Sequence, residues 1–263
     1  MAEKTAPIIK YAKDNGLHAL FFPYDTTRAR KDDLTNLCNY IMDHTAPDSI
    51  GIVDTMGCAT PEAIKHMVRW VNDMTGLPIE IHMHNDFGMG VATELAAVTA
   101  GAVCVHSCAN GLGERTGNAA LEELMMGLHL LYGYDTNYKL DKIPGLAEMI
   151  AQKSNIPIAR NKPVLVHGNF IRESGIGINY VMNDPLVMFA THPSLTGKVG
   201  EVVLGKKSGK ASIIYKMGEL GMGELEDDKI GLILNEVKLL GISKRDVLSN
   251  EEFANIVASV KRK

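Results

Sequence analysis

The stretch IEIHMHNDFGMG, residues 79–90, decides how this sequence is interpreted. In a β-strand alternate side chains face the same side, so Glu80, His82 and His84 share one face and apolar side chains occupy the other. Burying such a polar face without partners is costly. Two neutral imidazoles at positions i and i+2 can bind one divalent cation from the same side of a strand. The alternative is that they are two ordinary, partly exposed histidines, and the HxH pattern alone does not exclude it.

The sequence around this stretch repeats one simple unit, a short apolar segment followed by an amphipathic one. We expect strands at residues 17–22, 49–54, 78–84 and 102–108. We expect helices at residues 31–43, 60–74, 91–100 and 118–133. Strands that alternate with helices are typical of parallel βαβ units. Polar and glycine residues follow each predicted strand, at the edge where parallel α/β folds bind ligands.

The pattern changes after about Gly133, where loop-rich sequence with Pro, Gly and Lys precedes a helical region that starts near Ala211. We therefore predict two regions, residues 1–133 and residues 134–263. The second is expected to be a linker followed by a smaller helical subdomain.

Composition excludes several classes of function. The 263 residues are 46% hydrophobic and 22% charged, with a formal net charge of -4, which is typical of a globular protein without a nucleic-acid surface. The 4 cysteines form no CxxC pair, so reduced thiols in a cytoplasm are the simplest interpretation. No apolar run approaches the roughly 20 residues of a membrane helix. We expect a cytoplasmic protein that binds neither nucleic acid nor membrane.

Three segments carry a family resemblance. VDTMGCATPEA (residues 53–63), IEIHMHNDFGMGVATELAAV (79–98) and NGLGERTGNAALEEL (110–124) resemble the metal-dependent TIM-barrel acyltransferases and lyases. That superfamily includes isopropylmalate, homocitrate and citramalate synthases and hydroxymethylglutaryl-CoA lyase. GNFIRESGIG and VVLGKKSGKASI resemble the region that follows the barrel in the synthases. The resemblance implies an α/β fold of the (β/α)8 type. The chain contains only about four of the eight βα units, and these resemble the C-terminal half of the barrel.

The resemblance also implies roles for single residues. His82 and His84 match the metal-binding histidines, and Asn118 matches an Asn that lies near the metal in several members. The expected ion is Zn²⁺, Mn²⁺ or Mg²⁺, because a mixed set of nitrogen and oxygen ligands can bind any of the three. Thr55 and Glu80 are expected to orient a 2-oxo acid.

Two further positions near the predicted first strand bear on the substrate. Tyr24 stands where the family often shows a catalytic Glu, and we include it among the expected substrate-binding residues. Arg28 either meets a carboxylate of the substrate or faces water.

Other polar residues of the predicted site region have structural interpretations. Asp86 either orients a histidine ring or caps a helix, and Glu114 with Arg115 is expected to form an ion pair in the loop. His106 is interpreted as a packed or rim residue, with a ligand role as the lesser alternative.

The function implied by the resemblance is condensation of acetyl-CoA, or another acyl-CoA, with a 2-oxo acid. One alternative is a lyase or aldolase that cleaves a carbon–carbon bond at the same type of metal centre. Another is a truncated or partner-dependent inactive subunit. Arg172 and Gly177 occupy positions where the synthases carry two histidines, which favours the alternatives.

The family's first strand carries an Arg-Asp or Arg-Glu pair, whose acid is the remaining metal ligand. We expect these groups to come from a separate N-terminal half-barrel, or the chain to pair with a second copy as a homodimer.

Overall fold

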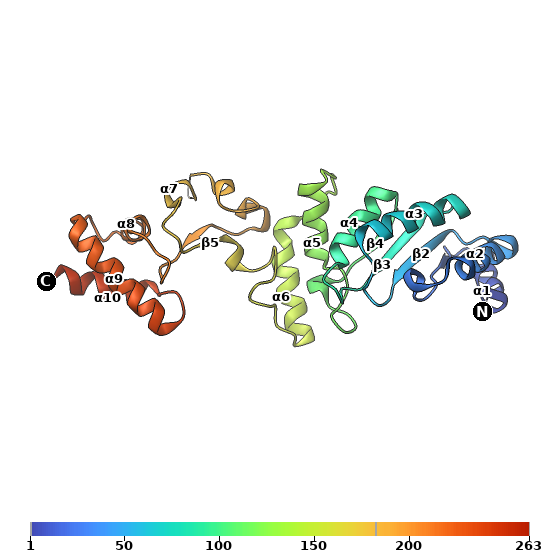
Figure 1. The fold of residues 1–263 in the computed structure, drawn as a ribbon, viewed down its shortest axis with the longest axis horizontal. Coiled ribbons are helices and arrows are strands. Elements are labelled where there is room, and N and C mark those ends of the chain that lie inside the picture. The colour runs from blue at the N-terminus through green and yellow to red at the C-terminus, as the bar shows by residue number, and fades with distance from the viewer. Residues whose placement is uncertain (1, 182, 263) are drawn as a thin grey trace. The chain divides into compact units, whose positions relative to one another are not determined.

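The computed structural model describes residues 2–181 and 183–262 (Figure 1). The chain forms two compact units, which are described separately below. The first comprises Met1–Lys139 and Gly145–Ile158, and the second comprises Leu140–Pro144 and Ala159–Lys263.

The first unit is built on a parallel four-stranded sheet in the order β1-β2-β3-β4, which confirms the predicted α/β class. Its strands are β1 (Leu20–Phe21), β2 (Ser49–Asp54), β3 (Ile79–Met83) and β4 (Cys104–His106). The order in the sheet follows the order in the chain, as in a barrel segment. β1 is much shorter than the predicted strand. Each of β1 and β4 pairs on one side only within the described residues.

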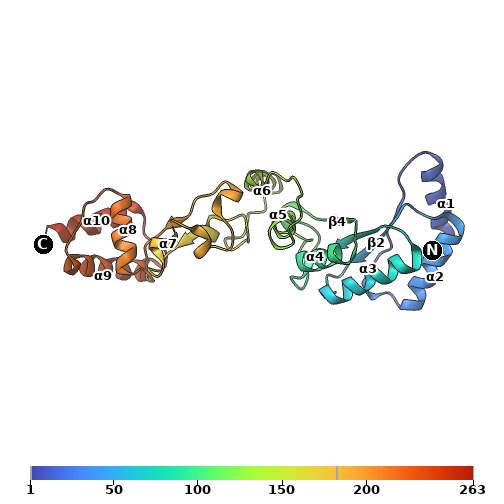
Figure 2. The same ribbon diagram turned by 90° about the horizontal axis from the view of Figure 1, so that it is seen from above.

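Helices cover one face of this sheet (Figures 1 and 2). Ile79, Ile81 and Met83 of β3 are buried there against residues of the surrounding helices. Alternation along β3 therefore directs Glu80 and His82 to the opposite face. The helices of this unit are α1 (Ala2–Asp14), α2 (Lys31–Thr45), α3 (Pro61–Thr75), α4 (Gly90–Ala100), α5 (Leu121–Met126) and, from Gly145 on, α6 (Ile143–Ser154).

Local signals define the ends of α3 as the sequence indicates. The Thr60 hydroxyl accepts a hydrogen bond from the Ala63 amide, and Pro61 occupies the first helical position. Gly76 ends the helix in the left-handed conformation with φ 67°, a backbone conformation that glycine adopts at little cost.

The structure differs from prediction around Asn118. The helix expected at residues 118–133 begins only at Leu121, and a π-helical turn, Gly127–Leu131, follows it. Tertiary hydrogen bonds hold the preceding residues extended, because the Ala119 amide donates to Met83 O at 3.2 Å and its carbonyl accepts from the Cys108 amide at 3.0 Å. Helices α1 and α6 were not predicted from the sequence.

The second unit combines short strands and helices around its own core. Phe253, Ile233 and Ile213 are almost fully buried in that core. Ser249 and Glu252 form a reciprocal capping box at the start of the last helix. The elements are β5 (Ile171–Arg172), α7 (Ile178–Val181), β6 (Glu201–Val202), α8 (Lys210–Glu219), α9 (Asp227–Lys244) and α10 (Asn250–Lys261). In the described part of the chain, no helix combines the length and apolar character needed to cross a bilayer.

Candidate metal and substrate site

The two histidines of the HxH pattern lie at the carboxyl end of β3 and its following loop. His82 is partly buried and His84 is 8% exposed, and their ring centroids are 5.3 Å apart. The Nδ1 atom of His84 is buried and has no hydrogen-bond partner within the described residues. Burial, with the nearby imidazoles of His84 and His106, lowers the pKa of His82 and so favours its neutral, ligand-competent form.

The loop after β4 brings Asn118 against these histidines. An isolated β-bridge pairs His84 with Asn118, and the Asn118 Nδ2 atom lies 3.2 Å from His82 Nε2. The glycines of the GLGERTGN segment make this approach possible. A Cβ at Gly113 would lie 2.1 Å from Asn118 Oδ1, and one at Gly117 would lie 1.9 Å from Gly111 O.

These three side chains fit a divalent cation. Two imidazoles and the Asn118 amide oxygen form a mixed nitrogen and oxygen donor set, although in this structure Asn118 directs its Nδ2 atom toward His82 Nε2 and Met83 O, at 3.2 and 3.3 Å. The orphaned Nδ1 of His84 is a buried polar atom that a bound ion could satisfy. The structure thus brings together the three residues that the sequence assigned to a metal, and that assignment stays a prediction.

The end of β2 forms the neighbouring wall of this edge. Asp54 is 1% exposed, accepts a hydrogen bond from the Thr27 hydroxyl at 2.7 Å, and accepts a second from the Ala59 amide at 2.9 Å. The hydroxyl oxygen of Thr55 accepts from the Asp25 amide at 2.9 Å, and among the described residues no acceptor takes its O–H proton.

Arg115 ties this wall to the loop after β3. Its guanidinium donates two 2.8 Å hydrogen bonds to the carboxylate of Asp86 and a 2.6 Å bond to Thr55 O. The hydrogen bond from Arg115 holds the pKa of Asp86 below its ordinary value. Arg115 also lies 3.7 Å from Glu114, the predicted partner, but Asp86 is the closer one. The partner of Asp86 is therefore an arginine, which neither sequence alternative anticipated.

Tyr24 and Arg28 occupy the exposed rim after β1. Tyr24 is 74% exposed. The Arg28 guanidinium binds the Asp25 carboxylate, with Nη2 at 2.7 Å from Oδ2, so its charge is already paired locally. Their expected contact with a substrate stays a prediction.

Glu80 is held in a network two residues before His82 on β3. Ser49 Oγ donates to its Oε1 at 2.6 Å, and His106 Nε2 lies 3.1 Å from its Oε2. Burial alone would raise the pKa of Glu80, but the hydrogen bonds from Ser49 and His106 outweigh it and hold the pKa below its usual value. His106, which the sequence indicates as a packed or rim residue, is therefore a partner of Glu80. The register of β3 and β4, which sets Glu80 opposite Cys104 and His82 opposite His106, brings the two side chains together, and no sequence pattern indicates it.

Comparisons with known proteins show the family to which this chain belongs. The family model described as HMGL-like matches residues 1–150. The chain is 35% identical over 258 residues to a homocitrate synthase, AksA, of Methanopyrus kandleri, covering 98% of this chain and 64% of that protein. It is 36% identical over 247 residues to a 2-isopropylmalate synthase of Methanocaldococcus jannaschii, covering 91% of this chain and 48% of that one.

The fold is similar to that of a solved enzyme as well. A crystal structure of the HMG-CoA lyase of Bacillus subtilis matches with a TM-score of 0.54 at 21% identity, over 61% of this chain and 58% of that one. The chain belongs to the HMGL-like family. It spans between about half and two thirds of the length of these curated relatives.

Proposed function

We propose that this chain takes part in a metal-dependent condensation of an acyl-CoA with a 2-oxo acid. The observation that carries the proposal is the convergence of His82, His84 and Asn118 at one sheet edge. The curated relatives above, both synthases, support it. In this reaction the acyl carbon next to the thioester loses a proton and attacks the keto carbon, and water then releases coenzyme A.

The proposed roles follow from the contacts. His82, His84 and Asn118 would hold a divalent ion, which supplies Lewis-acid polarisation of a keto oxygen when bound. Thr55 would orient the 2-oxo acid through its remaining O–H proton, because its oxygen already accepts from the Asp25 amide. Glu80 lies two residues before His82 on the same strand and has both carboxylate oxygens bonded, so it would orient the 2-oxo acid only indirectly, through the side chains that it holds on this face of the sheet.

In this proposal the loops after β2 and β3 position the substrate-binding residues and do not take part in the reaction themselves. Arg115 clamps the loops after β2 and β3 through Thr55 O and Asp86. Because this clamp spans two loops, it fixes Thr55 relative to the strand that carries the histidines. A substrate that is held in a fixed position has already lost much of its translational and rotational entropy. Less entropy is then lost on reaching the transition state, and the barrier is lower.

The test is thiol release from acetyl-CoA with a panel of 2-oxo acids that differ in side chain. We expect release that depends on one 2-oxo acid and on a divalent metal, and that falls at least about tenfold in Thr55→Val. Thr60→Val, which removes a hydroxyl at the start of α3, is the matched control. Metal-dependent cleavage of a carbon–carbon bond, without 2-oxo-acid-dependent thiol release, would instead establish the lyase alternative.

A further inference from the structure

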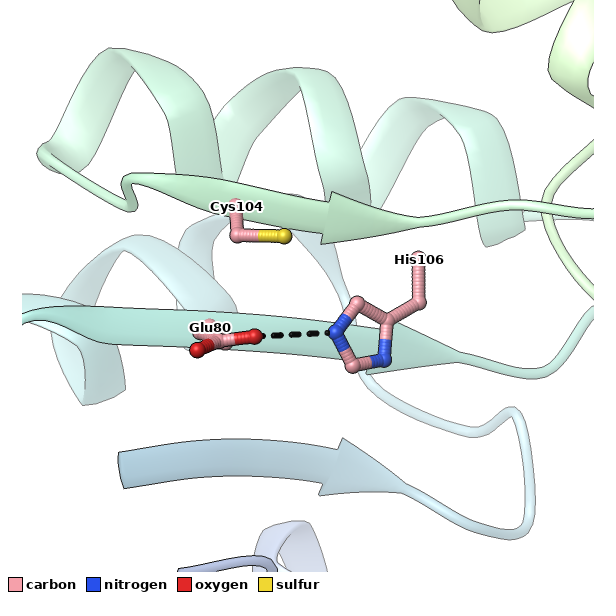
Figure 3. A group of neighbouring side chains, drawn as sticks. All are labelled: Glu80, Cys104 and His106. Carbon is pink, nitrogen blue, oxygen red and sulfur yellow. Dashed lines mark hydrogen bonds and ion pairs between the residues drawn. The ribbon is translucent and has the colours of Figure 1, made fainter. Parts of the chain in front are cut away.

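A second group of metal-ligating side chains lies beside the proposed centre. Glu80, Cys104 and His106 place one ligand atom each within 4.8 Å of one another (Figure 3). Glu80 lies on β3, and the other two lie on β4. In the sheet register Glu80 is directly opposite Cys104, and His82 is opposite His106.

The cluster is built by strand geometry rather than by a flexible loop. Side chains of directly opposed residues on neighbouring strands lie close together, and residues two apart share a face. Cys104 and His106 therefore share one face of β4 with Glu80 of β3. Figure 3 shows the Glu80 carboxylate directed at the His106 imidazole, with the Cys104 thiol beside them on the same face of the two strands.

We propose that Glu80, Cys104 and His106 form a zinc site separate from the His82, His84 and Asn118 group. Carboxylate, thiolate and imidazole are all zinc ligands, with bond lengths of about 2.0–2.3 Å. Two ligand atoms in a tetrahedral site are then roughly 3.3–3.6 Å apart. The observed 3.1 Å between Glu80 Oε2 and His106 Nε2 is close to that separation. A thiolate selects zinc over magnesium or manganese, which prefer oxygen ligands.

The ligands are also held by their neighbours, as metal ligands commonly are. Ser49 Oγ binds the other carboxylate oxygen of Glu80 at 2.6 Å. The Phe22 ring stacks on His106, with ring centroids 5.5 Å apart and planes 19° from parallel. Phe22 itself lies over Gly51, where a Cβ would come within 2.1 Å of its ring. His18 Nε2 lies 3.3 Å from the same Ser49 Oγ and 3.9 Å from Glu80 Oε1, so it borders the carboxylate on its far side.

Charge favours a divalent ion at this position. Ionised Glu80 and a Cys104 thiolate bring two negative charges, which Zn²⁺ neutralises, while His106 contributes a neutral nitrogen. Binding displaces the thiol proton, which goes to the solvent, while the single N–H proton of the neutral His106 ring sits on Nδ1 and leaves Nε2 for the ion.

Metal stoichiometry and cobalt spectroscopy on the 263-residue chain test the proposal. The chain is stripped with a chelator and loaded with Zn²⁺ or Co²⁺. We expect about two ions per chain, and about one in Cys104→Ser or in His82→Ala/His84→Ala. The cobalt form should show a near-ultraviolet thiolate charge-transfer band, which the His82/His84 double variant keeps and Cys104→Ser loses.

Cys58→Ser is the matched control, since it removes an exposed thiol outside the cluster and should leave both the band and the stoichiometry unchanged. His106→Gln, which keeps a polar side chain of similar size, is the second variant if Cys104→Ser does not fold. It should also lower the stoichiometry by about one ion. A band that persists in Cys104→Ser would overturn the proposal. So would a wild-type stoichiometry of one ion that the His82/His84 double variant abolishes.

Discussion

Asn118 Nδ2 lies 3.2 Å from His82 Nε2, although 36 residues separate them in the chain. A β-bridge between His84 and Asn118 fixes this relationship, and the Ala119 amide donates to Met83 O beside it. The backbone thus delivers the Asn118 side chain to the histidines. This geometry favours the binding of one metal ion by His82, His84 and Asn118 together.

Removal of both imidazoles is expected to abolish metal binding at this edge. The double variant His82→Ala/His84→Ala should lose about one divalent ion per chain, because an amide alone is a weak ligand. Asn118→Ala should retain that ion with reduced affinity. His66→Ala, on the exposed surface of α3, is the control. Metal analysis after gel filtration provides the measurement, and equal metal content in wild type and double variant would contradict the site.

Replacement of Arg115 by Lys is expected to loosen the loops around Thr55. Lysine cannot reproduce the paired bonds to Asp86 together with the third bond to Thr55 O. We expect the free energy of unfolding to fall, because three hydrogen bonds that join two loops cannot all be re-formed. Arg28→Lys is the matched control, since Arg28 pairs with Asp25 only three residues away on the exposed rim. Its effect should be smaller than that of Arg115→Lys, because an exposed local ion pair contributes little to stability. Urea titration measures the free energy of unfolding of both variants. Equal losses in the two would contradict a stabilising role for the three hydrogen bonds of Arg115.

Glu94 on α4 is expected to make stability fall as pH rises. It is fully buried, and burial raises its pKa to about 9 against a smaller lowering by a hydrogen bond from the backbone of Met83. Between the ordinary pKa of 4.5 and that value, the folded state holds a proton that the unfolded state releases, so folding is progressively penalised. A tenfold difference in proton affinity between the folded and unfolded states corresponds to about 1.4 kcal/mol, so the loss is on the order of a few kcal/mol.

Glu94→Gln tests this expectation, because an amide of the same shape does not ionise. Between about pH 5 and pH 9 the metal-free wild type should lose more stability in urea than the variant does. Glu62→Gln, at an exposed position at the start of α3, should follow the wild type. Parallel pH profiles for wild type and Glu94→Gln would show that Glu94 is ionised in the folded state.

The sequence predicted the four strand segments and the alternation along the HxH strand because both depend on local patterns. The apolar and polar alternation of residues 79–84 is visible directly, and so is the N-cap and proline at the start of α3. The late start of α5 was not predictable in this way. It depends on hydrogen bonds that Ala119 makes with Met83 and Cys108, which override local helix propensity.

The partners of single polar side chains were the least predictable feature. Asp86 was expected to orient a ring or cap a helix, yet Arg115, 29 residues away, binds it. His106 pairs with Glu80 because the register of β3 and β4 sets them side by side. Such pairings depend on strand register and loop paths, which residue periodicity does not encode.

The unpaired edges of the sheet lead to the last prediction, which concerns association. β1 and β4 each have a neighbour on one side only within the described residues, and Val103, next to β4, is 68% exposed. Edges of a parallel sheet present unpaired backbone groups and apolar side chains, so they tend to pair with another strand. We expect the purified chain to form a homodimer, or to associate with a separate half-barrel that supplies further strands.

Light scattering and native mass spectrometry distinguish these states, and one substitution at the edge tests the contact. Val103→Lys places a charge beside β4 and should shift the chain toward monomer, because an edge lysine opposes strand pairing. Val199→Lys, at a similarly exposed valine of the second unit, is the control and should leave the assembly unchanged. A homodimer is expected to turn over acetyl-CoA poorly, since it adds no acid from a different strand, whereas a complex with a separate half-barrel should be active. A stable monomer with full synthase activity would contradict both states.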